Sequence, residues 1–346
     1  MTIFARNIAL TTMLFASSIS YAEEFEPSVD VSGLIFAGYG LDLSDGAEGE
    51  SEFLLDRTYL TVRGNITEAL STRLTLDVGR AKPQTITVPD GAGGEVEIDV
   101  PEDTKFRYYM KYAYLQWKTP ISGVKMQFGA AGSPLVGYGD KFWGHRYVSK
   151  AFTDRNKILS SSVIGLHFVG SYADSPISWQ ANLINGEGYG SPEDGSDKTS
   201  QLRISADLLS GSDAGSLPVT VFGSTEFLTA EDDDPTTVLV GAGGYKMSHF
   251  LLWGEYVMEL EGDVTGSGYS AVVMPRIPEV GSLFMRYDYW DPNTDADLDA
   301  STTIIAGVSR DFARKVSAAT TYERETAEAA SDTPSHGVFI HAQAGF

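Results

Sequence analysis

The side chains best placed to act on a ligand are arginines and lysines at alternate positions of extended segments. Arg57 and Arg63 fall on one face of such a segment, whereas Leu54, Leu60 and Val62 fall on the other. Successive residues of a strand point to opposite sides, so this spacing predicts a strand with one basic and one apolar face. Fixed cations of this kind attract anions at close range.

Further basic residues follow this pattern or lie close by in the chain. Arg73 is on the polar face of the next alternating segment, and Lys125 opposes Val124 and Met126. Residues 131–158, which do not alternate, hold five cations and only two carboxylates: Lys141, Arg146, Lys150, Arg155 and Lys157 against Asp140 and Asp154. These cations could form a ring of positive potential at the narrowest point of a channel. They could equally belong to a solvated surface loop with a basic bias. Lys111 lies among so many tyrosines that the pattern assigns it to neither face.

Charge is distributed unevenly along the chain, whose formal net charge is −22. Residues 57–157 hold 15 Lys and Arg against 10 Asp and Glu, whereas residues 158–346 hold 9 against 27. Nucleic-acid phosphates recruit basic residues, so this balance argues against nucleic acid as a partner. The carboxylates gather between the alternating segments, at 42–52, 90–103, 193–197, 231–234 and 291–299. We expect them to keep loops solvated; bridging to lipopolysaccharide through divalent cations is a second option.

The sequence offers little for catalysis or for a metal site. None of the five histidines (His145, His167, His249, His336 and His341) lies in a G-x-S-x-G or H-E-x-x-H context, and the chain has no cysteine. The acidic run from Asp291 to Asp299 resembles a calcium loop in rhythm, but Ala296 replaces the required glycine and Thr302 the closing glutamate. We therefore expect no enzyme activity, no cofactor and no dedicated metal site.

The N-terminus reads as a cleaved signal peptide over residues 1–22. Arg6 precedes an apolar run from Ile8 to Phe15, and Ser20 and Ala22 are the small residues that precede a cleavage site. The run is too short to span a bilayer as a helix. We expect residues 23–346 to form the mature protein, outside the inner membrane.

Alternation recurs along the mature chain and ends in a strand that closes on phenylalanine. Phe346, Ala344, Ala342 and Ile340 share an apolar face, opposite Gln343 and His341, as in a transmembrane strand with a C-terminal barrel-assembly signal. Similar segments are expected at 29–42, 52–65, 69–80, 105–118, 122–130, 159–172, 176–185, 199–209, 217–228, 236–246, 249–260, 265–275, 281–290, 300–311, 315–325 and 336–346. The pattern predicts an all-β fold: a closed antiparallel transmembrane barrel of 16 strands, with lipid outside and water inside.

The connections support this topology, because short and long ones alternate. Residues 66–68, 119–122, 173–176 and 312–314 are short; 81–104, 131–158, 186–198, 229–235, 291–299 and 326–335 are mostly longer. Short periplasmic turns opposite long external loops are typical of such barrels. Both termini then lie on the periplasmic rim. We expect residues 131–158 to fold into the lumen, because Gly132-Ser133-Pro134 and Gly137-Tyr138-Gly139 permit a sharp bend.

Several segments resemble the phosphate-selective porin family, porins O and P. They are DRTYLTVRG at 56–64, Lys125 with GSP at 132–134 and FWGHRY at 142–147, and RYDYWDP at 286–292 followed by IAGV at 305–308. The resemblance implies a homotrimeric 16-stranded outer-membrane barrel with an in-folded third loop. The known members line their pores with Arg and Lys, and this chain is more acidic outside residues 57–157.

The sequence thus favours a passive channel for small hydrophilic solutes and ions. We expect the barrel to contact outer-membrane lipid and lipopolysaccharide and to have a weak anion or phosphate preference at moderate salt. At lower salt the selectivity should move toward cations, because the field of the acidic loops reaches further. Gly33, Ala37, Gly38 and Gly40 could form a flat subunit contact in a trimer. A barrel that anchors the cell surface without transport is the alternative, and an outer-membrane hydrolase is a weaker one.

Overall fold

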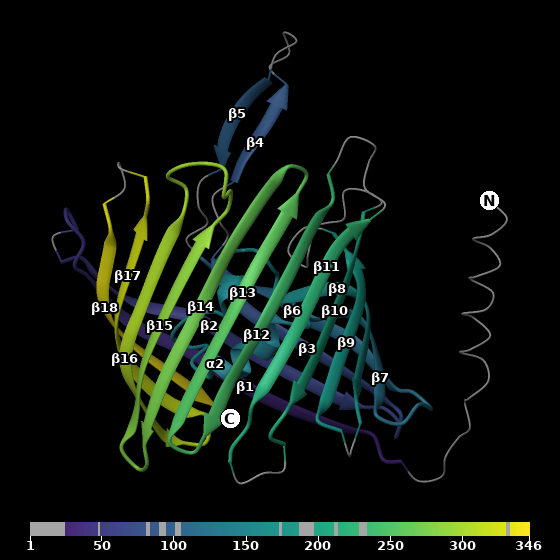
Figure 1. Cartoon of the computed structure of the whole chain (residues 1–346). Helices are drawn as coiled ribbons and strands as arrows, with labels where there is room; N and C mark the ends of the chain where they lie inside the picture. Colours follow the sequence, from purple (N-terminus) through teal and green to yellow (C-terminus); the bar gives the residue numbers. More distant parts are fainter. Residues whose placement is uncertain are drawn as a thin grey trace.

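The computed structural model describes residues 25–47, 49–80, 84–89, 95–100, 105–172, 175–186, 197–210, 214–227, 234–329 and 333–346. Sixteen antiparallel strands form a closed barrel in which each strand pairs with its neighbours in sequence and β1 pairs with β18 (Figure 1). The barrel strands are β1 Ser28–Asp42, β2 Ser51–Asn65, β3 Leu70–Arg80, β6 Phe106–Lys118, β7 Val124–Gly132, β8 Ser162–Ser171, β9 Ile177–Asn185, β10 Lys198–Asp207, β11 Pro218–Phe227, β12 Thr236–Met247, β13 Phe250–Glu261, β14 Val264–Ile277, β15 Gly281–Asp291, β16 Ser301–Ala313, β17 Val316–Ala327 and β18 Ser335–Gly345. The predicted fold class and number of barrel strands are confirmed.

Strand alternation puts apolar side chains on the outer face of the barrel. On β10, Leu202 and Ile204 are exposed, whereas Arg203 and Ser205 are buried on the inner side. The same division appears on β13, where Leu252 and Tyr256 are exposed while alternate residues are buried. An outer wall of this composition suits a hydrocarbon surrounding, and closure leaves no unpaired strand edge.

The last strand closes the barrel as its sequence pattern predicted. Ile340 and Phe346 are exposed on the outer side, whereas His341 is buried on the inner side. Phe346 and Gly33 exchange two backbone hydrogen bonds, and the phenylalanine ring covers Gly33 so closely that a Cβ there would lie 2.3 Å from it. A larger residue at position 33 would therefore displace the exposed Phe346 ring from this position. Whether this end acts as an assembly signal remains a prediction.

Three register shifts interrupt the alternation, in β2, β6 and β16, and the first corrects a predicted face. The β1–β2 register slips at Asp56, so Leu54 lies on the inner side beside Arg57 rather than opposite it. A second slip makes Lys111 the additional residue of β6, between the partners of Thr75 and Leu76 on β3. A bulge adds one residue to one strand and reverses the parity beyond it, which a strict period of two cannot anticipate.

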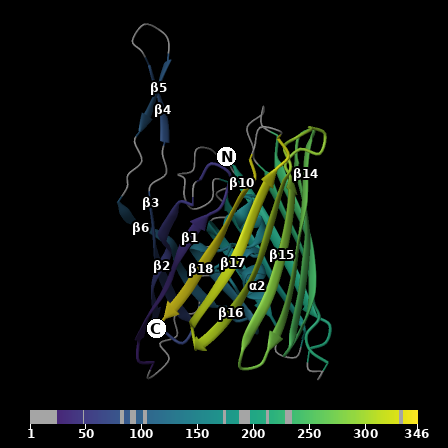
Figure 2. The same ribbon diagram turned by 90° about the vertical axis from the view of Figure 1, so that its left-hand side faces the viewer.

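The two rims differ, and we name them the turn end and the loop end. The turn end holds the β2–β3, β6–β7 and β16–β17 connections and the closure between Phe346 and Gly33. The loop end holds the β1–β2 and β15–β16 connections and a two-stranded hairpin, β4 Gln84–Pro89 with β5 Glu95–Val100, beyond the rim (Figure 2). The hairpin was not predicted within residues 81–104. Two connections depart from the predicted asymmetry: β13–β14 is short at the loop end, and β10–β11 is long at the turn end.

Some predicted features lie outside the described residues. They include the signal peptide at 1–22 and most of the acidic stretches at 90–103, 193–197 and 231–234. Within the described part of the chain, no helix has the length and apolar character needed to cross a bilayer.

Candidate functional site: an internal segment and the passage beside it

Residues 133–161 connect β7 to β8 and pack inside the barrel, where α2 lies among the strands in both views (Figures 1 and 2). We call them the inner segment. It contains α2 Val136–Trp143 and α3 Phe152–Arg155. The predicted bend at Gly137-Tyr138-Gly139 is wrong, because these residues lie within α2; the chain turns at Gly144, whose φ is 69°. A left-handed residue ends many helices, and glycine adopts it without steric cost.

One side of the inner segment packs against apolar residues that β13 to β16 direct inward. The Phe142 ring stacks on Trp253 with centroids 4.6 Å apart, and Trp143 meets Phe284 edge to face at 5.6 Å. His145 extends this contact, since its Nδ1–H donates to the Trp143 carbonyl (3.1 Å) and its Nε2 accepts from Ser309 (2.8 Å). Aromatic packing of this extent fixes the segment to one half of the wall.

A second apolar cluster fixes the two ends of the segment. Leu135, Val136 and Phe152 are almost fully buried against β11, β12, β13 and β15, and the Phe152 ring meets Trp290 at 6.3 Å. The inner face of this half is therefore covered by protein, so the expectation of water inside the barrel does not hold there. The apolar inward residues are tolerated because the inner segment, rather than water, covers them.

A buried arginine reinforces this docking. Arg286 on β15, 1% exposed, makes a bidentate pair with Asp288 at 2.8 and 2.6 Å and donates through Nη1 to the Lys150 carbonyl at 2.6 Å. Its guanidinium also lies 5.4 Å from the centre of the Trp143 ring. The planar donor set of arginine suits such a site, because it satisfies a carboxylate and a loop carbonyl together.

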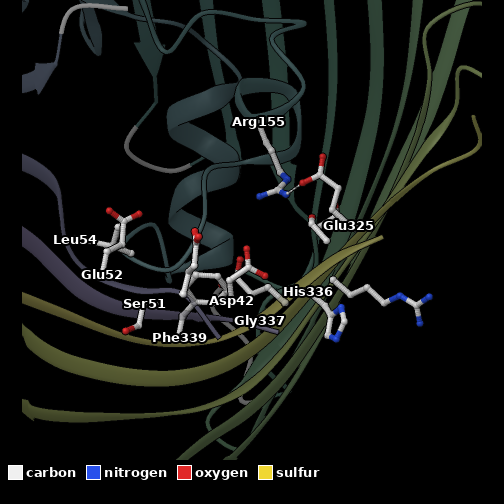
Figure 3. A pocket seen from close by; sticks show the side chains of 15 residues that line it. Asp42, Ser51, Glu52, Leu54, Arg155, Glu325, His336, Gly337 and Phe339 are labelled. Atoms are coloured by element: carbon white, nitrogen blue, oxygen red, sulfur yellow. Dashed lines mark hydrogen bonds and ion pairs between the residues drawn. The ribbon is translucent and has the colours of Figure 1, made fainter. Parts of the chain in front are cut away.

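The other side of the inner segment carries charges, and most of them are paired. Arg146 contacts Asp140 and Asp154 at 3.2 Å each, and Lys150 lies 3.9 Å from Asp154. Arg155 reaches across to Glu325 on β17 at 2.7 Å (Figure 3). Carboxylates thus largely offset the predicted ring of positive potential. One of them, Glu325, is far from Arg155 in the sequence and could not be paired with it from the sequence alone.

The facing wall brings further predicted residues to the same space. Arg57 contacts Asp77 at 2.8 Å and also the Tyr109 hydroxyl. The Arg73 guanidinium lies over the Tyr112 ring at 4.4 Å. Lys111, which the sequence could not place, is 3% exposed and its ammonium donates to Ser161 of the inner segment at 2.6 Å.

The remaining predicted residues are more exposed. Arg63 lies near the turn end of β2, opposite Arg73 in the pairing register. Lys125 is exposed near the start of β7, beside the β6–β7 turn and far along the strand from the inner segment. Lys141 is exposed on α2, and Lys157 is exposed with a φ of 61°. The structure thus groups Arg57, Arg63, Arg73 and Arg146 around one space and leaves Lys125 away from it.

That space is a row of three cavities between the inner segment and the wall formed mainly by β1, β2, β3, β6, β17 and β18. We call it the passage. Its volumes are about 550, 510 and 470 Å³ from the loop end to the turn end. Arg155 and Glu325 line both of the first two cavities, and Phe36 and Arg146 line both of the last two, so neighbouring cavities adjoin each other. Figure 3 shows the side chains around the first.

Burial shifts the ionisation of groups in the inner segment. It raises the pKa of Asp140, an effect that neighbouring Arg146 partly offsets, and it raises the pKa of the Tyr147 hydroxyl. Burial also lowers the pKa of His145, which keeps the imidazole neutral near pH 7. Loss of hydration disfavours the charged form in each case.

Sequence reasoning missed the acidic residues of the passage. Asp56, Glu323 and Glu325 line its middle cavity, and Asp77 is fully buried beneath Arg57. The alternation of Glu323 and Glu325 with Tyr322 and Arg324 was the available sign. His341, taken as a residue of the polar face, is buried beside Glu323 at 3.2 Å. No group of three or more His, Asp or Glu residues in the described part of the chain is arranged to hold a metal ion.

Comparison with protein-family models and with curated proteins finds no match. Solved structures do match over nearly the whole chain. The outer-membrane expressed OmpT of Vibrio cholerae has a TM-score of 0.63 at 14% identity, covering 94% of this chain and 99% of that one. An anion-selective porin from Comamonas acidovorans matches with a TM-score of 0.65 at 12% identity, covering 93% of this chain and 100% of that one. OmpF of Salmonella typhi, in complex with daunomycin, matches with a TM-score of 0.63 at 11% identity, covering 92% of this chain and 97% of that one. The chain therefore has the 16-stranded barrel fold of outer-membrane porins.

Proposed function

We propose that this protein is an outer-membrane porin, a passive diffusion channel for small hydrophilic solutes and ions. The observation that carries the proposal is the passage, a row of three adjoining cavities lined by charged side chains, which runs from rim to rim inside a barrel whose outer face is apolar. Water and ions need such a lining, because a charged group without hydration or a partner is costly. The likeness to solved porins supports a channel rather than an enzyme.

Anion preference is the finer part of the proposal. The turn-end cavity is lined by Arg63, Arg73, Lys111, Arg146 and Lys315, with Asp140 as the opposing carboxylate. Fixed cations close to an ion's path and flanked by low dielectric favour anions, phosphate among them. Acidic residues elsewhere in the passage weaken this preference, so we expect weak rather than strict selectivity.

The anchoring barrel without transport is the second candidate. It would need the closed fold but not a row of charged cavities from rim to rim. Purified protein in planar bilayers separates the two: a porin gives stable steps of conductance, whereas an anchor gives none. Swelling of proteoliposomes in small sugars adds a readout for neutral solutes. Absence of both, with the barrel shown to be folded by heat-modified migration on gels, would overturn the proposal.

The assembly and surroundings follow from the same proposal. We propose a homotrimer that contacts its copies through the outer face of β1, β2 and β18, where Ala37 and Ala342 border a shallow depression. Gly38 and Gly40 cannot contribute as expected, because their side-chain positions face inward, toward Leu54 and the Phe339 ring. Native mass spectrometry in mild detergent tests the trimer. We also propose that the barrel contacts outer-membrane lipid and lipopolysaccharide and that the signal peptide is cleaved near Ala22. Acidic loops would bridge to lipopolysaccharide through divalent cations.

A further inference from the structure

Charge along the passage is ordered from one rim to the other, and β2 shows this within one strand. From the loop end toward the turn end, its charged passage-lining side chains are Glu52, Asp56, Arg57 and Arg63. The two carboxylates come first and the two guanidinium groups last. At about 3.3 Å per residue, Glu52 and Arg63 are separated by roughly 35 Å of strand.

The opposite edge of the passage repeats the order. Glu325 and Glu323 lie on β17 toward the loop end, whereas Lys315, in the turn that precedes β17, lies at the turn end. The charged side chains that line the two end cavities show the same order. The loop-end cavity is lined by five carboxylates and two arginines, and the turn-end cavity by five basic side chains and one carboxylate.

The middle of the passage is close to neutral because its charges are paired. Arg57 pairs with Asp77 beside the middle cavity. The Arg155–Glu325 pair lies where the middle cavity meets the loop-end cavity, and Arg146, paired with Asp140 and Asp154, lies where it meets the turn-end cavity. Without these pairs the loop-end cavity still has more carboxylates than cations, and the turn-end cavity still has only cations. At physiological salt the Debye length is about 8 Å, much shorter than the separation of the ends. The two fields therefore do not cancel, and each end sets its own local ion population.

We infer that the passage conducts ions asymmetrically, as a junction between a cation-attracting and an anion-attracting half. This inference rests on the proposed diffusion channel. The sign follows from the order of charges. A voltage that is positive at the loop end drives cations inward through the acidic half and anions inward through the basic half, so both accumulate at the junction and conductance rises. The opposite voltage withdraws both, and conductance falls.

The test is the current–voltage relation of single channels in KCl at low and high salt. The orientation of each channel is read from Ala47→Cys, in the loop-end β1–β2 connection, with an impermeant thiol reagent added to one chamber; the chain has no other cysteine. At 0.1 M KCl and 100 mV we expect the current to be about twofold larger with the loop end positive. At 1 M KCl, where the Debye length is about 3 Å, the ratio should approach 1.

Two double variants separate the halves. Arg63→Gln with Arg73→Gln should bring the low-salt ratio toward 1 and shift the reversal potential toward cation preference. Glu52→Gln with Glu323→Gln should bring the ratio toward 1 and shift the reversal potential toward anions. Arg310→Gln removes a turn-end cation from the outer face of β16, beside exposed Val308, and should change neither.

The outcomes are distinct. Absence of conductance in the folded wild type would overturn the diffusion channel itself. Conductance with a symmetric current at low salt, an asymmetry of opposite sign, or a ratio that neither double variant alters would leave the channel intact and overturn the axial junction. If Arg310→Gln changed the current ratio and the reversal potential as much as Arg63→Gln with Arg73→Gln does, the axial junction would also be overturned.

Discussion

The inward side chains are mainly apolar in one half of this barrel and include many charged residues in the other, although both sets follow from the same alternation along the strands. The inward residues of β11 to β16 are mainly apolar and pack against the inner segment, as Trp253, Phe284 and Ile305 do. Those of β2 and β17 include Arg57, Glu323 and Glu325 and border the passage. We call these the docked half and the passage half.

The difference shows that one segment assigns the roles of both walls. Where the inner segment covers the wall, apolar residues gain from burial; where it does not, charged residues stay hydrated or paired. The inner segment is itself divided in this way, with Trp143 and Phe152 on its docked side and Arg146 and Arg155 toward the passage. The docked half therefore determines the position of the passage.

The largest loss of stability is expected from breaking the buried Arg286–Asp288 pair of the docked half. Arg286→Leu leaves the Asp288 carboxylate buried without its partner, which typically costs about 3–5 kcal/mol. We expect the inner segment to loosen and single-channel conductance to become larger and noisier. Proteolysis at Lys141 and Arg146 should accelerate. Arg286→Leu with Asp288→Leu should recover much of the lost stability in urea unfolding, and failure of the double variant to recover any would count against the pairing account.

A slightly smaller loss of stability is expected when the contact between Phe142 and Trp253 is removed. Trp253→Ala removes the ring on which Phe142 stacks, and truncation of a buried aromatic costs about 3–5 kcal/mol before relaxation. Part of that cost should be recovered as α2 shifts into the space. Tyr256→Ala, on the exposed outer face of the same strand, is the matched control and should leave proteolysis of the inner segment unchanged. Equal protease sensitivity of the two variants would contradict a dry docked half.

Acidification should weaken the docked half through His145. The pKa of His145 is lowered by burial, and among nearby charged groups Asp311 raises it and Arg276 lowers it. Because the unfolded imidazole takes up its proton first, stability is fully present above the ordinary histidine pKa and is lost as pH falls toward the folded value. Proteolysis of the inner segment should therefore increase below about pH 6.5. His145→Gln should remove most of this pH dependence; an unchanged pH profile would exclude His145 as its source.

The smallest effect on stability is expected on the passage side. The Arg155–Glu325 pair is partly exposed, and such pairs contribute about 0–1 kcal/mol. Arg155→Gln should leave urea unfolding nearly unchanged while it moves the reversal potential in a salt gradient toward cations. A loss of stability comparable to that of Arg286→Leu would show that the two halves do not differ as described.

The sequence predicted the barrel well because alternation and chain ends are local properties. Strand number, antiparallel order and the outward face of β10 and β18 all follow from a period of two. Leu54 was misassigned because a bulge at Asp56 reverses parity without a local sign in composition. Lys111 could not be assigned because its segment is rich in tyrosine, and the structure shows that a bulge at this residue also interrupts the alternation.

The passage was less predictable because it depends on contacts between distant residues. Arg155 meets Glu325 only after 170 residues of chain have closed the barrel. The apolar inner wall of the docked half could not be inferred from alternation, since an apolar residue at an inward position and one at an outward position look alike. Only the course of the inner segment distinguishes them.

The most direct test of the passage uses two neighbouring residues of β17 that face opposite sides. Glu323 lines the passage, whereas Tyr322 is exposed on the outer face. Single cysteines are introduced at these positions into a chain that has none, and a bulky, charged thiol reagent is added during planar-bilayer recording. The account predicts that the reagent lowers single-channel conductance of Glu323→Cys by more than half and leaves Tyr322→Cys unchanged. Unchanged conductance in Glu323→Cys after complete labelling, confirmed by mass, would show that ions do not cross the barrel through this passage.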